Sequence, residues 1–316
     1  MCTAISYQTT SHYFGRNLDL ERGYGEGVVI TPRRYPLSFR HLPPLTEHYA
    51  MIGMAAVANN YPLYFEATNE KGLSMAGLNF PGNASYATVA KGYDNVASFE
   101  LIPYLLGNYA SVDEITAAPN HFRVVDTNVS KELPTSPLHW LISDARRSIT
   151  LECTRDGMKI YDNPFGVLTN NPTFDYHLTN VSNYMHLHAG ASRNHLSDDF
   201  PVTNYSLGMG ALGLPGDFSS ASRFVRAIYV KENSVCGGSE EESVHQFFHI
   251  LSSVAMPRGC VLAHNGLYEY TRYSSCCNTE SAVYYYTTYH NRSIRQIHLH
   301  ATDLNAKTLY TYQTQR

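Results

Sequence analysis

The order in which strand-like and helix-like segments follow one another is the feature that most constrains the fold. Apolar runs of strand type occupy much of the N-terminal third, at residues 3–7, 27–31, 50–58, 63–68 and 72–80. Further runs lie at residues 139–143, 148–154 and 158–161, and near the C-terminus at 282–289, 293–300 and 308–312. Short runs of this kind, separated by turn residues, are typical of strands buried on at least one face.

Helical segments are few and lie between these groups of strands. Residues 98–110, 221–231 and 242–255 fit helices. A short helix is predicted from Ser111, which can cap it, with Asp113 and Glu114 in its first turn. Residues 170–217 are rich in Pro and Gly and are predicted to be mainly loop. Because strands and helices do not alternate strictly, the sequence predicts an α+β fold with antiparallel sheets covered by helices.

Composition narrows the class of protein and its partners. Of the 316 residues, 43% are hydrophobic and 16% are charged, and no repeat or linker divides them, so we expect one large domain. The net charge is −4 and the basic residues are scattered, which argues against nucleic-acid binding. No run approaches the roughly 18 apolar residues of a membrane span. We therefore expect neither a nucleic acid nor a membrane as partner.

The N-terminus and the cysteines predict a cytoplasmic location. The first residues, Met1-Cys2-Thr3-Ala4, lack the basic region and the long apolar region of a signal peptide. The six cysteines form no Cys-x-x-Cys pair and are too sparse for a disulfide scaffold. Both observations favour a reducing compartment.

The position of Cys2 makes it the first candidate for chemistry. Its side chain is small enough for the usual processing enzyme to remove Met1, which leaves a thiol and a free α-amine on one residue. Such an amine has a pKa of about 7.7–8.0 and a thiol about 8.5, so near neutral pH the amine can act as base for its own nucleophile. If Met1 stays attached, the amine is an amide and this base does not exist.

A guanidinium and a carboxylate follow shortly after the first predicted strand, in Gly15-Arg16-Asn17-Leu18-Asp19. A carboxylate can orient an α-ammonium, and an Arg stabilises a thiolate. In an extended segment Arg16 and Asp19 point to opposite faces, so a turn or bulge is needed to bring both to the N-terminus. By itself this spacing is a weak signal and is more typical of a surface ion pair.

The sequence is also compatible with two other kinds of site, a histidine metal site and a Cys–His catalytic pair. His186-Leu187-His188 and His298-Leu299-His300 could each place two rings on one face of a strand, but no third ligand pattern accompanies them. We expect solvated histidines, and neither a metal nor a cofactor. A papain-like Cys–His pair with His139 as the base is a further alternative, although His139 lies in a predicted strand and suits a core position.

Motifs along the whole chain resemble those of the choloylglycine hydrolase family, which includes bile salt hydrolases and penicillin V acylases. Eight segments in order carry the resemblance: Met1-Cys2-Thr3, Phe14-Gly15-Arg16-Asn17-Leu18-Asp19, Asn69-Glu70-Lys71-Gly72-Leu73, Ala76-Gly77-Leu78-Asn79-Phe80-Pro81, Leu138-His139-Trp140, Leu168-Thr169-Asn170-Asn171-Pro172, Gly213-Leu214-Pro215-Gly216-Asp217-Phe218 and Ser222-Arg223-Phe224. Each segment alone is weak, whereas eight in order after a Cys at position 2 are specific.

The resemblance implies a four-layer αββα sandwich of the N-terminal nucleophile hydrolase type, formed as a single domain by residues 2–316 after Met1 is removed. It implies that Cys2 is the nucleophile and that its α-amine is the base. Arg16 and Asp19 would hold and tune that terminus. The absence of Cys2, Arg16, Asp19 or Asn170 would favour a non-catalytic binding protein of the same fold, the most distant of the functional alternatives, but all four residues are present.

The resemblance also assigns the groups that stabilise the oxyanion. Asn170 would supply a side-chain donor, Asn79 would supply its backbone N–H, and Arg223 would complete the polar cluster. Amide hydrolysis by a thiol passes through a tetrahedral oxyanion, and one preorganised donor is typically worth about 10²–10³ in rate. Asn suits this role because its amide is a neutral donor.

The implied function is hydrolysis of glycine- or taurine-conjugated bile salts, with penicillin V or other N-acyl amides as the alternative substrates. Asn79 matches the bile salt hydrolase pattern, whereas the penicillin acylase branch often has Tyr there. A steroid needs a wide apolar pocket. From the family's loop positions we expect it to be lined by Tyr24, Ala58, Tyr61, Phe65, Leu138, Leu267 and Tyr268. The family resemblance further implies a homotetramer.

Overall fold

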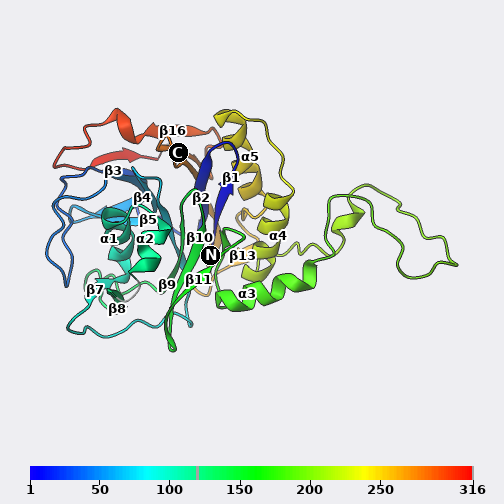
Figure 1. The fold of residues 1–316 in the computed structure, drawn as a ribbon, viewed down its shortest axis with the longest axis horizontal. Coiled ribbons are helices and arrows are strands. Elements are labelled where there is room, and N and C mark those ends of the chain that lie inside the picture. Colours follow the sequence, from blue (N-terminus) through cyan, green and yellow to red (C-terminus); the bar gives the residue numbers. More distant parts are fainter. Residues whose placement is uncertain (119–120, 315–316) are drawn as a thin grey trace.

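Two β-sheets packed face to face between two layers of helices form the body of the molecule (Figure 1). The structure, a computed structural model, describes residues 1–118 and 121–314. Within these residues the first sheet has seven strands in the order β12-β1-β2-β14-β15-β16, with β13 paired to β14. Its strands are β1 (Cys2–Gln8), β2 (His12–Leu20), β12 (Val167–Leu168), β13 (Val261–Leu262), β14 (Tyr268–Asn278), β15 (Val283–Thr288) and β16 (Arg295–His298).

The second sheet has eight strands in the described part of the chain, in the order β11-β10-β9-β6-β5-β4-β3-β17. These are β3 (Gly27–Thr31), β4 (Met51–Ala58), β5 (Tyr61–Asn69), β6 (Ser74–Asn79), β9 (Leu138–Ser143), β10 (Ser148–Thr154), β11 (Gly157–Asp162) and β17 (Tyr310–Gln313). Neighbouring strands are antiparallel in both sheets. A small parallel pair, β7 (Asp94–Ala97) and β8 (Phe122–Val125), lies apart from them.

Helices cover the outer face of each sheet, which completes the predicted αββα sandwich. On the eight-stranded sheet lie η1 (Ser98–Glu100), α1 (Leu101–Asn108) and α2 (Val112–Ala117), and on the seven-stranded sheet α3 (Phe174–Val181), α4 (Ser220–Glu232) and α5 (Glu240–Ser252) (Figure 1). Short 3-10 turns are η2 (Ser182–Tyr184), η3 (Met209–Ala211) and η4 (Leu299–Ala301). Ser111 caps α2 by accepting from the Glu114 N–H, as predicted.

The period-two alternation of strand side chains builds two separate cores. In β3, Val28 and Ile30 point into the space between the sheets, while Val29 packs with α1 and α2 on the other side. Successive strand residues face opposite ways, so a strand buried on both faces reads as a continuous apolar run. This explains why the sequence showed such runs without clear alternation.

Strands β2 and β14 and helix α3 are the longest of the elements that were not predicted, and the short strands β7, β8, β12 and β13 were missed as well. Strands β2 and β14 carry many polar residues, and these satisfy one another inside the sheet; for example, the Ser274 hydroxyl donates to the Asn17 side chain at 2.6 Å. Gly15 of β2 lies directly against the backbone of β14, and a Cβ added at Gly15 would come within 2.0 Å of the Ser275 carbonyl oxygen. Helix α3 lies in the segment predicted to be loop, where it packs against α4. Tertiary contacts therefore outweigh local pattern in these segments.

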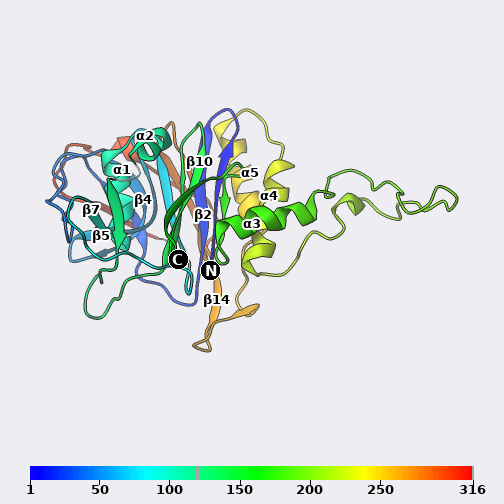
Figure 2. The ribbon, with the colours of Figure 1, turned by 60° about the horizontal axis from the view of Figure 1, so that its bottom comes forward.

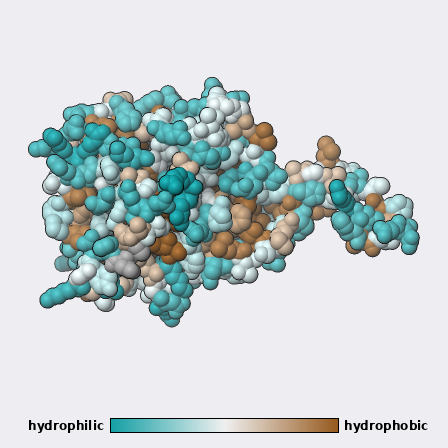
Figure 3. All heavy atoms as spheres, in the orientation of Figure 1, coloured by the Kyte–Doolittle hydropathy of each residue, from teal (hydrophilic) through white to brown (hydrophobic). Residues whose placement is uncertain are grey.

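Residues 185–217 form an arm that leaves the body between η2 and α4 and extends far from it in both views (Figures 1 and 2). The arm carries exposed apolar side chains, namely Met185, Leu196, Phe200, Val202, Tyr205, Leu207 and Leu212. Brown surface is visible where the arm meets the body and at places along the arm (Figure 3). None of the described helices has both the length and the apolar character of a membrane span.

Candidate active site

Cys2 begins β1 at the edge of the space between the sheets and is almost completely buried, with 3% of its surface exposed. The pairing of β1 with β2 places Cys2 opposite Leu18, directly beside Asp19. Its backbone nitrogen donates a hydrogen bond to Oδ1 of Asn170 at 2.8 Å. The thiol and the nitrogen of Cys2 are therefore held in one place by two segments distant in sequence.

Met1 continues the strand one residue beyond Cys2. Its carbonyl oxygen accepts from the Asp19 N–H at 3.0 Å. Its ammonium donates to the Asp19 carbonyl oxygen at 2.7 Å and to Oε2 of Glu269 at 2.5 Å. In this form the nitrogen of Cys2 belongs to a peptide bond, and excision of Met1 would convert it into a free amine next to Asn170.

Arg16 projects from β2 into the space between the sheets and is fully buried. One Nη donates to the carbonyl oxygens of Phe65 at 2.9 Å and Gly77 at 2.6 Å, while Nη2 has no hydrogen-bond partner in the described residues. Burial by itself lowers the pKa of Arg16, but the electrostatic interactions with Cys2, Tyr273, Glu66 and Asp19 outweigh it, so the net pKa lies above the ordinary value. Arg16 thus remains a cation facing the thiol.

Asp19 is also fully buried, on the stretch of β2 that borders Met1. Its Oδ1 accepts from the Thr271 hydroxyl at 2.6 Å, and Oδ2 has no partner in the described residues. Burial raises the pKa of Asp19, against the opposing charges of the N-terminal ammonium, Arg223 and Arg16. The register between β14 and β2 shifts beside Asp19, between Thr271 and Tyr273, but the extra residue lies on β14. The segment from Arg16 to Asp19 itself stays extended within β2, so the turn or bulge expected there is absent.

Arg223 reaches the same centre from α4 and has no exposed surface. Its guanidinium donates to the Cys2 carbonyl oxygen, to the Thr3 hydroxyl at 2.7 Å and to Oδ1 of Asn170 at 2.7 Å. Burial lowers the pKa of Arg223, opposed by the charges of Asp19, Cys2 and Glu269. Arg223 therefore fixes the start of β1 and the amide of Asn170 together.

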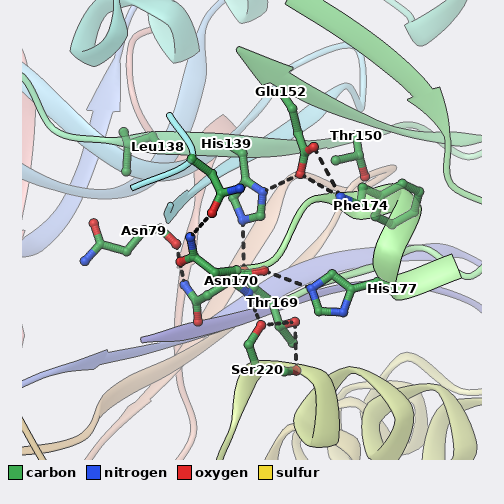
Figure 4. A network of polar contacts seen from close by, with 12 residues as sticks. Asn79, Leu138, His139, Thr150, Glu152, Thr169, Asn170, Phe174, His177 and Ser220 are labelled. Atoms are coloured by element: carbon green, nitrogen blue, oxygen red, sulfur yellow. Dashed lines mark hydrogen bonds and ion pairs between the residues drawn. The ribbon is translucent and has the colours of Figure 1, made fainter. Parts of the chain in front are cut away.

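The side chain of Asn170 is oriented by both of its ends. Oδ1 accepts from Cys2 and Arg223, so Nδ2 must point the other way, where it donates to the Asn79 carbonyl oxygen at 2.7 Å. Figure 4 shows that the side chain of Asn79 points away from Asn170. One N–H of the Asn170 amide is thereby used, and the second is left to donate to a substrate.

The segment that carries Asn170 is held from three elements, as Figure 4 shows. The Ser220 hydroxyl at the start of α4 accepts from the Asn170 N–H at 2.8 Å, His177 of α3 contacts the Asn170 carbonyl oxygen at 2.9 Å, and His139 of β9 contacts the Thr169 carbonyl oxygen at 3.1 Å. Neighbouring Asn171 points elsewhere and donates to the Pro81 carbonyl oxygen at 2.7 Å. Of the two adjacent asparagines, only Asn170 joins the Cys2 centre.

His139 is fully buried and forms part of this support. Its Nδ1 lies 2.9 Å from Oε1 of Glu152, its Nε2 faces Thr169, and its ring stacks on Phe80 with centroids 4.1 Å apart. Both ring nitrogens already have partners. The geometry therefore gives no support to a Cys–His pair and matches the core position expected for His139.

Glu66 is a buried group near the site that the sequence argument missed. It accepts from the hydroxyls of Tyr273 at 2.6 Å, Ser275 at 2.9 Å and Tyr284 at 2.5 Å, and Oε2 lies 3.9 Å from Nε of Arg16. Burial raises its pKa, although the charge of Arg16 and these hydrogen bonds oppose the shift. An acidic residue inside the apolar run of residues 63–68 was the available signal, because a buried carboxylate needs such partners.

The residues expected to line a substrate pocket fall into three groups. Phe65, whose carbonyl binds Arg16, has its ring 6.4 Å from that of Tyr24, and Leu138 pairs with Asn79. Ala58 and Tyr61 face each other at the tip of the β4–β5 hairpin, where Tyr61 packs on Phe99. Leu267 and Tyr268 are half exposed beside the β13–β14 hairpin, which projects from the body in Figure 2.

No group of three or more His, Cys, Asp or Glu side chains in the described part of the chain is arranged to hold a metal ion. What the cluster offers is a thiol and an adjacent nitrogen, two buried guanidiniums, a buried carboxylate and an oriented amide. These are the groups that amide-bond cleavage by an N-terminal nucleophile uses.

Comparison with known proteins decides the family. The model of the linear amide C–N hydrolases of the choloylglycine hydrolase family matches residues 2–312. The chain belongs to the choloylglycine hydrolase family. It is 51% identical over 312 residues to the bile salt hydrolase/transferase of Lactiplantibacillus plantarum, covering 99% of this chain and 96% of that protein. It is 39% identical over 316 residues to the conjugated bile acid hydrolase of Lactobacillus acidophilus, covering 99% and 100%.

Solved structures of choloylglycine hydrolase relatives have the same fold. The C2A mutant of the conjugated bile acid hydrolase from Clostridium perfringens superimposes with a TM-score of 0.92 at 35% identity, covering 100% of this chain and 97% of that one. Penicillin V acylase from Agrobacterium tumefaciens gives a TM-score of 0.77 at 21% identity, covering 99% and 91%. The second likeness concerns the fold alone. The chain is accordingly a hydrolase of linear amide bonds with the αββα architecture.

Proposed function

We propose that this protein hydrolyses the amide bond of glycine- or taurine-conjugated bile salts, with Cys2 as the nucleophile. The observation that carries the proposal is the nitrogen of Cys2 held by Asn170 within a fully buried cluster of Arg16, Asp19 and Arg223. Close relatives over the full length are named bile salt or conjugated bile acid hydrolases, which supports this substrate class.

The first half of the reaction uses the groups around Cys2. Once Met1 is removed, the α-amine takes the thiol proton and the sulfur attacks the amide carbon. The carbonyl oxygen becomes an oxyanion, for which the free N–H of Asn170 and the backbone N–H of Asn79 are the proposed donors. Arg16 and Arg223 favour the negative charge that develops in this low-dielectric site.

The second half releases both products. The α-ammonium gives its proton to the departing glycine or taurine nitrogen, which leaves a thioester between the bile acid and Cys2. The same amine then activates water, which attacks the thioester and restores the thiol. Asp19, with one carboxylate oxygen free, is the proposed group that orients the α-amine through these steps.

For the steroid we propose contact with the apolar groups nearest this centre, Phe65, Tyr24 and Leu138, with Ala58, Tyr61, Leu267 and Tyr268 bordering the entrance. Phe65 and Leu138 are the best supported, because their backbones join Arg16 and Asn79. Penicillin V remains the competing substrate. The chain carries Asn79 where the penicillin acylase branch often has Tyr, which favours bile salts.

We further propose that residues 2–316 work as one domain without metal or cofactor, that the enzyme is a cytoplasmic homotetramer and that the arm of residues 185–217 mediates the assembly. An extended arm with exposed Leu196, Phe200, Tyr205 and Leu207 has little of its own chain to pack on. All six cysteines, which lie in the described residues, are free, as suits a reducing compartment. Light scattering of the intact protein and of a Leu207→Asp variant tests the assembly, and cell fractionation tests the location.

The decisive experiment compares hydrolysis of glycocholate, taurocholate and penicillin V by protein whose intact mass shows that Met1 is absent. We expect release of glycine and taurine to exceed cleavage of penicillin V, and to stop after alkylation of Cys2. Preferential cleavage of penicillin V would move the substrate assignment to the acylase branch. No turnover of any of the three by Met1-free protein would overturn the proposal.

A further inference from the structure

Glu66 is a buried carboxylate that joins the two sheets beside Arg16. It belongs to β5 of the eight-stranded sheet, and the three hydroxyls that donate to it belong to β14 and β15 of the seven-stranded sheet. Its Oε2 lies 3.9 Å from Nε of Arg16, and in the described part of the chain it forms an ion pair with no other side chain. The carboxylate is therefore fixed by two sheets and faces a single cation.

A β-bulge in β5 directs the Glu66 side chain into the space between the sheets. Glu66 pairs with Met54 of β4, whereas the next residue of β4 pairs with Tyr64, so Phe65 is an extra residue. Tyr64 packs in the core beneath α1 and α2, while Phe65 packs in the core between the sheets. Consecutive residues of a regular strand face opposite sides. The bulge instead brings the Phe65 ring and the Glu66 carboxylate to one face, as bulges beside functional sites often do.

The guanidinium of Arg16 is held at two of its three nitrogens. Nη1 donates to the carbonyl oxygens of Phe65 at 2.9 Å and Gly77 at 2.6 Å. Nε donates to the Asn17 carbonyl oxygen at 3.5 Å and lies beside Glu66. Nη2 has no hydrogen-bond partner among the described residues. Because a guanidinium is planar and rigid, holding two nitrogens sets the direction of the third.

The charged side chains around Cys2 are Arg16 and Asp19 of β2, Arg223 of α4 and Glu269 of β14. Of the two guanidiniums, Arg16 is the one with a nitrogen that no described group uses. A buried guanidinium is costly unless an opposite charge compensates it. The Glu66 carboxylate supplies that charge at the side of Arg16 where Nε lies.

We propose that Glu66 is a positioning residue for the hydrolysis, which through its ion pair holds Arg16 with the free Nη2 directed at the Cys2 thiolate. Glu66 makes no hydrogen bond to Cys2 within the described residues, so it acts through Arg16. This inference rests on the proposed function, because it takes the Cys2 thiolate as the nucleophile that Arg16 stabilises. A Glu66 that only joined the sheets would affect stability and leave the thiol unchanged.

The test measures how fast iodoacetamide alkylates Cys2 at a series of pH values, in Met1-free parent and in Glu66→Gln, from the mass of the N-terminal peptide. Without its partner the Arg16 guanidinium recedes from the thiol, so the midpoint of the profile should rise by about one pH unit. Loss of a negative charge that acted directly on Cys2 would lower the midpoint instead. The kcat for glycocholate should fall about tenfold with KM within about twofold, because the thiolate and not substrate binding is affected.

Two further variants separate an effect through Arg16 from a general loss of structure. Adding Glu66→Gln to Arg16→Gln should leave the midpoint where Arg16→Gln alone puts it, because no cation is left to position. Glu66→Asp keeps the charge but withdraws it from Arg16, so its midpoint should rise by less than that of Glu66→Gln. Where Glu66→Gln does not fold, Glu66→Asp decides alone, and an unchanged or lower midpoint then overturns the proposal.

Glu70→Gln is the matched control, because it removes another carboxylate that pairs with an arginine. Oε1 of Glu70 accepts from Nε of Arg33 at 2.9 Å and from the Ala50 N–H at 2.8 Å. Glu70→Gln should lower the melting temperature and leave the alkylation midpoint and kcat at the values of the parent.

The positioning role is overturned by an unchanged or lower midpoint in folded Glu66→Gln. It is also overturned if Glu66→Gln raises the midpoint further in the Arg16→Gln background. The alkylation profile needs no bile salt, so it is independent of the substrate assignment. The proposed function fails separately if enzyme alkylated at Cys2 still hydrolyses glycocholate.

Discussion

Strands β1 and β2 carry a buried polar cluster at each end, and the two clusters differ in kind. At the open end lie Cys2 and Asp19, with Arg16 below them. At the hairpin end lies His12, whose Nε2 is 2.8 Å from the Ser6 hydroxyl and whose Nδ1 is 2.9 Å from the Thr279 hydroxyl. Cys2, Arg16, Asp19 and His12 are buried, whereas Ser6 is partly exposed. Both clusters combine a potential nucleophile with a potential base.

The two clusters differ in whether all of their buried polar atoms have hydrogen-bond partners. At the hairpin end the hydrogen bonds close on themselves, since Ser143 donates to Ser6 at 2.9 Å and Thr279 donates back to the His12 carbonyl oxygen at 3.2 Å. At the Cys2 end, Nη2 of Arg16 and Oδ2 of Asp19 have no partner among the described residues. A buried charge without a partner is costly and persists where a reaction uses it. A neutral cluster in which the polar atoms bond to one another, such as the cluster around His12, stabilises the fold instead.

The largest expected effect comes from replacing the nucleophile. Cys2→Ser should lower kcat/KM for glycocholate by ~10³-fold or more, because a hydroxyl is far harder to ionise than a thiol. The melting temperature should change little, since the two side chains are similar in size. The matched change at the other end, Ser6→Ala, should leave kcat/KM within a few fold. An active Cys2→Ser enzyme would remove the distinction between the two ends.

The second largest effect is expected from replacing the side-chain amide of Asn170. Asn170→Ala should lower kcat by about 10²–10³-fold through loss of the oxyanion donor. Asn171→Ala is the neighbouring control, because that side chain binds Pro81 and Asn83 and not Cys2. Steady-state kinetics of both variants on glycocholate give the measurement. Equal losses in the two variants would show that the loop, and not the Asn170 amide, is what matters.

Changes in the cluster at the hairpin end are expected to alter the free energy of unfolding and not the catalytic rate. Burial lowers the pKa of His12 to about 4, below its value of about 6.5 in an unfolded chain. Between these values the unfolded state binds a proton that the folded state does not. Stability is therefore complete above pH of about 6.5 and is lost as the pH falls toward 4, by up to about 3 kcal/mol.

Urea unfolding at a series of pH values measures this loss, and His12→Gln is the variant that isolates it. The variant should be less stable at neutral pH and should lose less stability on acidification, while its kcat/KM at neutral pH stays within a few fold. His177, whose pKa burial also lowers, contributes to the same pH window in both proteins. An identical pH dependence of unfolding in the two proteins would contradict the assignment to His12.

The smallest effect on catalysis is expected at His139. Its ring supports the Asn170 segment through Thr169 and Glu152, so His139→Gln should lower the melting temperature. The pH dependence of kcat/KM should keep its shape, because the proposed base is the amine of Cys2. Loss of a limb near pH of about 6–7 would revive a Cys–His mechanism.

Much of the site could be predicted from the sequence, because its residues stand in recognisable motifs. Cys2, Arg16, Asp19, Asn79, Asn170 and Arg223 were all named, and the structure brings them together. The family and the αββα fold were likewise predicted, and they are confirmed by the family match and by the layers seen in Figure 1. The roles of these six residues stay predictions that the variants above test.

Other features were not visible in the sequence. Strand β14 has a polar composition, so it was missed, and with it Thr271 and Glu269, which lie beside Asp19 and Met1. Glu66 was hidden inside an apolar run, and α3 inside a segment with many loop residues. In each case the stabilising partners come from strands or helices distant in the chain, where local pattern has no information.

The sequence by itself determined which groups this protein has for chemistry, since a Cys at position 2 and the surrounding motifs supply a thiol, an adjacent nitrogen and polar side chains, for which the family resemblance predicts the roles of nucleophile, base and donors. Only the tertiary structure decided which asparagine of Asn170-Asn171 faces Cys2 and that Glu269 lies beside the N-terminus. It also decided that the ring of His139 supports the Asn170 segment through Thr169. The physical reason is that residue types fix chemical capacity, whereas direction and proximity arise from sheet register and packing between segments far apart in sequence.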